Sequence, residues 1–187
     1  MIALLSRPRP ILVLAGITAI AVVILLGMGR PPISTSGVVT LWGHVGPEQS
    51  QMIADWYTPS HIVHGFLFYA LLHLVARRWP VERRFLVALI VEAAWEIFEN
   101  TPMIIDRYRE ATIALGYSGD SILNSVSDLA AMALGYWAAR RLPTGVSVAV
   151  VLLLELVPLI AIRDNLTLNV LMLVAPSETV LAWQAGA

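Results

Sequence analysis

The sequence of 187 residues contains no cysteine and no lysine, and only 13% of its residues are charged. Without cysteine, the chain can form no disulfide bond, no thiolate metal site and no thiol nucleophile. The 12 basic and 13 acidic residues nearly balance, so the charge gives no indication of nucleic-acid binding. The chain is instead rich in apolar residues, which make up 58% of it, and its mean hydropathy is +0.75. This composition is typical of a small polytopic membrane protein.

Five apolar segments approach the length of about 20 residues that a helix needs to cross a bilayer. The sequence therefore predicts an all-α bundle that forms a single membrane domain over residues 1–187. The predicted spans are residues 11–28, 59–76, 85–100, 121–139 and 146–162. Between the third and fourth spans, residues 102–115 are predicted to form an interfacial helix, because their apolar side chains would share one face. Residues 166–184 leave open whether a sixth membrane segment follows.

The positions of the arginines predict the orientation of these spans. Eight arginines lie in alternate connections and four lie on the opposite side. The eight are Arg7, Arg9, Arg77, Arg78, Arg83, Arg84, Arg140 and Arg141. Because cytoplasmic connections carry the excess of arginine, the N-terminus is predicted to be cytoplasmic and the C-terminus, after five spans, to lie outside.

Polar side chains interrupt three of the apolar segments at helical spacing. They are His61 and His64 on the second segment, Glu92, Glu96 and Glu99 on the third, and Asp120, Asn124 and Asp128 at the start of the fourth. At about 100° per residue, each set falls on one face of its helix. The second and fourth spans run inward and the third runs outward, so most of these side chains are expected at one depth near the outer face.

No arginine lies within the predicted spans to neutralise these acids. Because a charge at the bilayer centre costs about 3 kcal/mol or more, the acids require protonation, imidazolium partners or a bound cation. We predict a divalent-cation site. Its predicted ligands are His61, His64, Glu96, Glu99 and Asp120. Ligands of this kind without sulfur suit Zn, Mn, Fe or Mg.

Further polar residues are predicted to support this site. Glu92, Asn124, Asp128 and Glu155 would hydrogen-bond the ligands or form a proton path. Haem is not expected, because the span histidines all lie on one segment. Each polar residue taken singly also has a structural interpretation. Asp120 or Ser121, for example, would serve as the cap of the fourth helix.

Three functions are compatible with this pattern. The first is metal-assisted hydrolysis of a lipid-linked or envelope substrate, with Glu96 or Glu99 as the base. The second is a non-enzymatic cation or proton pathway that continues inward through Glu92, Asp128 and Glu155. The third is an assembly subunit of a membrane complex, in which the polar stripes bind partner helices. The residue pattern alone does not choose between them.

The stretches TPSHIVHGF, EAAWEIFENTP and GYSGDSILNSVSDLAAMALGYW resemble those of an uncharacterised family of bacterial inner-membrane proteins, which share a domain of unknown function. The last stretch is also distantly similar to VanZ-like membrane proteins. The resemblance implies a multi-pass location in the inner membrane and supplies no activity. GYSGDS is similar to the GxSG motif of rhomboid proteases, but their base lies on a later helix and every histidine here precedes residue 74. A Ser118–His61 pair is the remaining form of that alternative.

Overall fold

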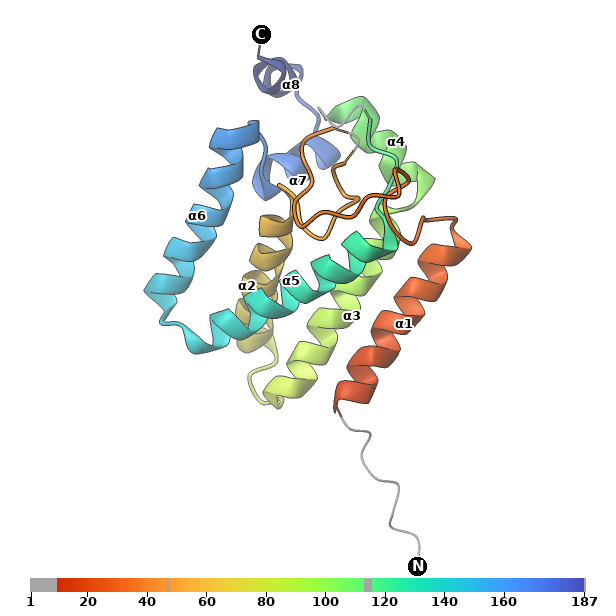
Figure 1. Ribbon diagram of the computed structural model, residues 1–187. Helices are drawn as coiled ribbons and strands as arrows, with labels where there is room; N and C mark the ends of the chain where they lie inside the picture. The colour runs from red at the N-terminus through yellow and green to blue at the C-terminus, as the bar shows by residue number, and fades with distance from the viewer. Residues whose placement is uncertain (1–9, 47, 113–115, 187) are drawn as a thin grey trace, which may run out of the picture.

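The computed structural model describes residues 10–46, 48–112 and 116–186, which fold into helices joined by irregular segments (Figure 1). The helices are α1 (Pro10–Gly27), α2 (Thr58–Val75), α3 (Val81–Glu99), α4 (Pro102–Ala111), α5 (Ile122–Arg141), α6 (Thr144–Ile162), α7 (Leu166–Val174) and α8 (Glu178–Ala185). No strand occurs in these ranges, so the all-α expectation is confirmed. Helices α1, α2, α3, α5 and α6 coincide with the five predicted spans. The end of the predicted interfacial helix, residues 113–115, lies outside the described residues.

Helices α2 and α5 cross at a glycine on each helix. A Cβ atom added to Gly65 would lie 2.1 Å from a backbone oxygen of α5, and one added to Gly135 would lie 2.0 Å from a backbone oxygen of α2. Small residues allow two helix backbones to approach this closely. In Figure 1, α5 runs diagonally across the bundle. His61 lies one turn before Gly65 and Asp128 two turns before Gly135, so the crossing brings the polar faces of the two helices together.

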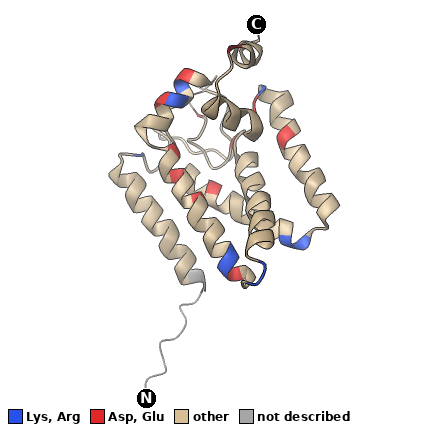
Figure 2. Cartoon of the chain, turned by 180° about the vertical axis from the view of Figure 1, so that it is seen from behind, with Lys and Arg blue, Asp and Glu red and all other residues tan. Residues whose placement is uncertain are grey.

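An apolar core lies between α1, α3 and α5, on the side of the crossing where the arginines gather. Its buried residues are Ala21, Phe85, Ala88, Leu89, Ala93, Leu129, Met132 and Tyr136. We call this side the arginine-rich end, because the α2–α3 connection, the first turn of α3 and the last turn of α5 lie there. They carry Arg77, Arg78, Arg83, Arg84, Arg140 and Arg141. Figure 2 shows these basic segments in blue, away from most of the acidic residues.

At the opposite end, the segment between α1 and α2 folds over the start of α5. The backbone N–H of Ile122 donates to the carbonyl of Pro31 at 2.8 Å, and the N–H of Ser121 donates to the carbonyl of Ser50 at 2.9 Å. The Ser121 hydroxyl accepts the N–H of Asn124 and so caps α5. Of the two predicted caps, Ser121 is therefore the one that the structure contains. This segment closes the end of the bundle over the polar faces.

Helix α4 also covers this end, and its sides differ as its sequence pattern predicts. Ile104, Ile105 and Tyr108 are buried, whereas Asp106 and Glu110 are exposed. The buried face packs against Tyr117, which precedes α5, and against α7. Thr101 occupies the N-cap position of α4, but its side chain makes no capping hydrogen bond.

Among the described residues, α6 is the one helix both long and apolar enough to cross a membrane. The apolar part of α1, Leu12–Gly27, is shorter. Helices α2, α3 and α5 carry the histidines and acids described above, which lower their mean hydropathy. The five-span topology and the orientation of the two termini therefore stay predictions.

Candidate metal centre

His61 of α2 stands between acids from two other helices. Its Nδ1 atom lies 2.7 Å from Oε1 of Glu92 and 3.5 Å from Oε1 of Glu96, both on α3. Its Nε2 atom lies 3.7 Å from Oδ2 of Asp128 on α5. Both ring nitrogens therefore face carboxylates. In metal-binding histidines, one ring nitrogen commonly binds the ion while the other donates to a carboxylate, and His61 has this surrounding.

Glu92 joins the two histidines of α2. His64 Nδ1 lies 3.0 Å from Oε2 of Glu92, and Glu92 is fully buried. The ligand atoms of His61, His64 and Glu92 all lie within 4.8 Å of one another, so this group can hold a metal ion. The sequence predicts a supporting role for Glu92. The structure brings it closer to the histidines than the predicted ligand Asp120, which belongs to neither of the two groups with metal-binding spacing.

A second group with the same spacing is formed by His61, Glu96 and Glu99. Glu96 is 0% exposed, and neither of its carboxylate oxygens has a hydrogen-bond partner among the described residues. Glu99 has one, because the hydroxyl of Tyr108 lies 2.9 Å from its Oε1 atom. A buried carboxylate without hydrogen bonds is destabilising, so a bound cation would stabilise Glu96 more than the other members of this group.

Asp120 is held by neighbours of its own, before the start of α5. Its Oδ2 atom accepts from the amide of Asn100 at 2.6 Å, and its Oδ1 atom accepts from the hydroxyl of Tyr117 at 2.9 Å. Burial raises the pKa of Asp120 to about 6, although the hydrogen bonds from Tyr117 and Asn100 act in the opposite direction. Burial and the charge of Asp120 raise the pKa of Tyr117 well above its usual value.

The remaining residues predicted for the site make their contacts outside the two His–Glu groups. The amide of Asn124 donates to the carbonyl of Met52 at 3.0 Å, so it holds the covering segment on α5. Glu155 lies on α6, and its Oε2 atom accepts from the backbone N–H and the hydroxyl of Thr167 at the start of α7. The structure does not join Glu155 to either His–Glu group. Ser118 is exposed and makes no described contact with His61, so nothing supports a serine–histidine pair.

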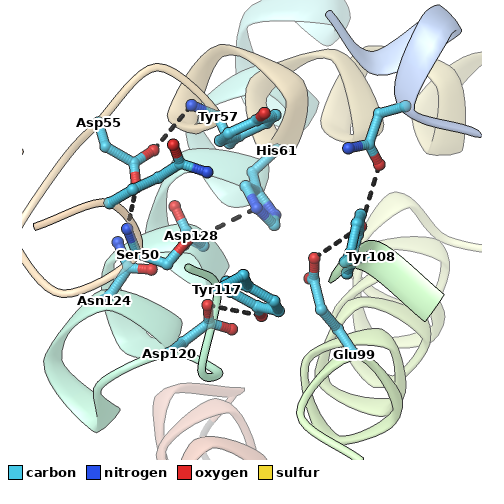
Figure 3. Close-up of a pocket in the computed structure, with 12 residues that line it drawn as sticks. Ser50, Asp55, Tyr57, His61, Glu99, Tyr108, Tyr117, Asp120, Asn124 and Asp128 are labelled. Atoms are coloured by element: carbon cyan, nitrogen blue, oxygen red, sulfur yellow. Dashed lines mark hydrogen bonds and ion pairs between the residues drawn. The ribbon is translucent and has the colours of Figure 1, made fainter. Parts of the chain in front are cut away.

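Two small cavities adjoin the cluster. The first has a volume of about 30 Å³, room for about two waters, since one needs about 10–15 Å³ by this measure. Figure 3 shows His61, Glu99, Tyr108, Asp120 and Asp128 around it. The second has a volume of about 120 Å³ and lies between α2, α3 and α7. It is lined by polar residues of the cluster and also by Trp95, Leu166 and Val170.

The cluster contains more acid than base. The five carboxylates named above, Glu92, Glu96, Glu99, Asp120 and Asp128, face two histidines. In the part of the chain that the structure describes, the one ion pair between an arginine and a carboxylate is Arg109–Asp106, in α4. Even with both imidazoles protonated, three carboxylates lack a counter-charge, so protons or cations must balance them.

Sequence reasoning missed several groups that hold the acids in place. Tyr108, Tyr117, Asn100 and Asn169 bond to Glu99, Asp120 or one another. Asn100 lies in EAAWEIFENTP and Tyr117 in GYSGDS, close in sequence to the predicted site residues Glu99 and Asp120. This closeness in sequence was the one signal that could have identified them. Tyr108 belongs to the apolar face of an amphipathic helix, which gave no sign of a contact with Glu99.

The fold and this cluster define a class: an all-α protein with buried histidines and carboxylates at metal-binding spacing. The chain belongs to the family described as "Protein of unknown function (DUF2585)", which matches residues 25–186 and so includes every residue of the cluster.

Curated relatives carry the description UPF0314 protein. That of Rhizobium meliloti (strain 1021) is 54% identical over 173 residues, which are 91% of this chain and 88% of the relative. That of Sinorhizobium fredii is 56% identical over 173 residues, with coverage of 91% and 88%. That of Novosphingobium aromaticivorans is 52% identical over 178 residues, with coverage of 91% and 90%. No solved structure matches the chain. The comparisons show this family and do not show the distant VanZ-like resemblance.

Proposed function

We propose that the chain is a multi-pass protein of the bacterial inner membrane, spanned by α1, α2, α3, α5 and α6. Large apolar side chains are exposed on all five helices, including Ile20, Leu74, Ile90, Leu134 and Ile160. An apolar surface of this extent is unfavourable in water and marks a membrane or protein contact. The acids and histidines that lower the hydropathy of α2, α3 and α5 are turned inward, so they do not oppose contact between these helices and lipid.

We further propose that the cluster binds a divalent cation. The observation that carries this proposal is Glu96, whose two oxygens are buried beside His61 and Glu99 without a hydrogen-bond partner among the described residues. A cation between these groups would supply the missing partner and reduce the excess of negative charge. The nitrogen and oxygen ligands suit Zn, Mn or Fe, and the carboxylates alone suit Mg.

The activity that this arrangement supports best is hydrolysis of a lipid-linked or envelope substrate. A cation held by these groups would polarise the scissile bond and lower the pKa of a bound water molecule. Glu99 lines both cavities and bonds to Tyr108, so it is the candidate base that removes the proton from that water. Trp95 and Val170 give the larger cavity an apolar wall beside these polar groups. A substrate with an apolar tail and a polar reactive group fits this combination.

The test uses a fluorogenic carboxylic ester and a fluorogenic phosphate ester, each with one acyl chain, in detergent micelles. Protein is loaded separately with Zn, Mn, Fe(II) or Mg. We expect turnover with at least one cation, loss of turnover in Glu96→Gln, and turnover lower by about 100-fold or more in Glu99→Gln. Glu82→Gln is the matched control, because Glu82 lies exposed at the far end of the same helix. Turnover that survives Glu96→Gln contradicts the assignment.

A cation or proton pathway across the membrane has less support. Beyond Glu92 and Asp128, towards the arginine-rich end, α3 and α5 carry the apolar core, in which Met132 is 0% exposed. Glu155, which would continue a path, bonds to Thr167 instead. Proton or cation flux into liposomes that Glu155→Gln abolishes would favour the pathway over hydrolysis.

A further inference from the structure

A second cavity system lies at the other side of the α2–α5 crossing, between α2, α5 and α6. Its volume is about 450 Å³, within the range of about 300–1,000 Å³ that is usual for small-molecule sites. Its lining is mainly apolar and includes Phe66, Leu67, Leu74, Val148 and Leu152. We call it the α6 cleft. In Figure 1, α6 flanks the bundle on the side opposite α1, and Pro158 is the one buried residue described on α6.

The buried, positively charged side chain of an arginine lies behind one wall of the α6 cleft. Arg84, at the start of α3, is only 8% exposed, and no carboxylate oxygen among the described residues lies within 4.0 Å of it. Its Nε atom is buried without a hydrogen-bond partner. An arginine side chain stays protonated in proteins. Burying such a charge without a counter-ion is costly, so an anion that reaches it would be stabilising.

His73 connects Arg84 with the cleft. Arg84 Nη1 lies 3.0 Å from His73 Nδ1, and His73 lines the cleft. A guanidinium can only donate, so Nδ1 of His73 accepts and its Nε2 atom must carry the ring hydrogen. Ser147, which also lines the cleft, has a buried hydroxyl without a partner. Arg84 Nε and the Ser147 hydroxyl are thus buried groups that can donate and have no acceptor among the described residues.

We propose that the α6 cleft binds one anionic phospholipid, with an acyl chain along its apolar lining and the phosphate next to His73 and Arg84. The apolar volume fits the chain, and the donors and the buried charge fit a phosphate. The exposed arginines of the same end, Arg77, Arg78, Arg140 and Arg141, add attraction for an anionic headgroup. This inference rests on the proposed membrane location and is independent of the metal centre.

The experiment measures lipid retention on the purified full chain by native mass spectrometry. Phosphatidylglycerol and phosphatidylcholine with identical acyl chains are titrated in detergent micelles. We expect wild type to bind one phosphatidylglycerol with an apparent Kd at least about tenfold lower than for phosphatidylcholine, a difference of about 1.4 kcal/mol. Equal affinity for the two lipids would overturn the proposal.

Two matched pairs of variants locate the site. Leu152→Trp fills the cleft, and Leu153→Trp adds the same bulk at a neighbouring exposed position that does not line it. Only Leu152→Trp should weaken phosphatidylglycerol binding, by about tenfold or more. Arg84→Gln should remove the preference for phosphatidylglycerol, whereas Arg83→Gln, which removes an exposed charge next to it, should keep the preference.

Each pair also has an outcome that contradicts the proposal. Undiminished binding in Leu152→Trp would show that lipid does not occupy the cleft. This variant changes an exposed side chain, so the test does not depend on whether Arg84→Gln folds. Loss of the preference in Arg83→Gln as well as Arg84→Gln would show a general surface attraction and no specific site. Metal content is measured on the same samples, so failure here is distinguishable from failure of the metal proposal.

Discussion

Glu96→Gln is expected to change stability in opposite directions with and without metal. In the metal-free protein, the carboxylate of Glu96 is 0% exposed and both of its oxygens lack hydrogen-bond partners among the described residues, with His61 Nδ1 3.5 Å from Oε1. Leaving a buried polar group unsatisfied costs about 1–3 kcal/mol. A neutral amide costs less to bury than a carboxylate, and its NH₂ group can donate to neighbouring acids. We expect the free energy of unfolding of the metal-free variant to exceed that of wild type by about 1 kcal/mol, which corresponds to a melting temperature about 2–4 °C higher.

With metal the order reverses. A ligand at 100 times its Kd adds about 2.7 kcal/mol to the stability of a protein that binds it, or about 5–11 °C. Wild type should gain this amount and Glu96→Gln almost none. The assay is thermal unfolding followed by circular dichroism in detergent micelles, with and without Zn or Mn.

Two results would refute this reasoning. A metal-free Glu96→Gln variant that is less stable than wild type would mean that the carboxylate has a stabilising partner. Equal stabilisation of both proteins by metal would mean that Glu96 is not a ligand. Glu82→Gln, on the exposed part of the same helix, should follow wild type in both conditions.

Three more predictions follow from the geometry. Gly135→Ala should destabilise the fold by about 3 kcal/mol or more in denaturant melts, because its Cβ would lie 2.0 Å from the α2 backbone. The control is Gly16→Ala, whose Cβ would have no neighbour within 4 Å. Similar changes in the free energy of unfolding for the two variants would contradict the close crossing. Tyr108→Phe should lower turnover by about 10- to 100-fold with metal retained, because Glu99 loses its hydroxyl partner; unchanged turnover would contradict this. Folded Asp120, with its pKa raised to about 6 by burial, binds more protons than the unfolded chain between about pH 4 and 6. Metal-free wild type should therefore lose stability as pH rises through this window, and Asp120→Asn should lose less; parallel profiles would count against it.

The sequence predicted the helices well, because apolar periodicity and helix caps are local signals. The bounds of the described helices lie within a few residues of those predicted for each segment. Ser121 caps α5, which was one of the two caps that the sequence offered for this helix. The same periodicity placed His61, His64, Glu92 and Glu96 on inward faces. These side chains form contacts with one another in the structure, because the helix faces that carry them point toward each other. The contacts do not depend on the orientation of the bundle in a membrane.

The detailed membership of the cluster could not be predicted. Which acid of a stripe meets His61 depends on how far one helix is rotated and shifted along another. In the structure Glu92 contacts both histidines, and Asp120 belongs to neither group with metal-binding spacing. Asp120 precedes the first residue of α5, so loop geometry directs it to Asn100 and Tyr117.

The tail is a further element that helical periodicity alone could not place. Helix α7, of 9 residues, is too short to span a bilayer by itself. It lies against the cluster, where Asn169 bonds to Tyr108 and Val170 lines the cavity of about 120 Å³ between α2, α3 and α7. This contact joins parts of the chain that are 61 residues apart. Contacts over such separations are set by packing and leave no local pattern in the sequence.

The most direct test of the central claim is the metal content of protein purified without chelator, beside Glu96→Gln and the control Glu82→Gln. The account predicts close to one equivalent of a divalent cation per chain in wild type and in Glu82→Gln. It predicts loss of that cation in Glu96→Gln with helical content unchanged by circular dichroism. Wild-type protein that binds no Zn, Mn, Fe or Mg even after reloading would contradict the account, and neutral acids bonded within the cluster would then be the explanation of its buried charge.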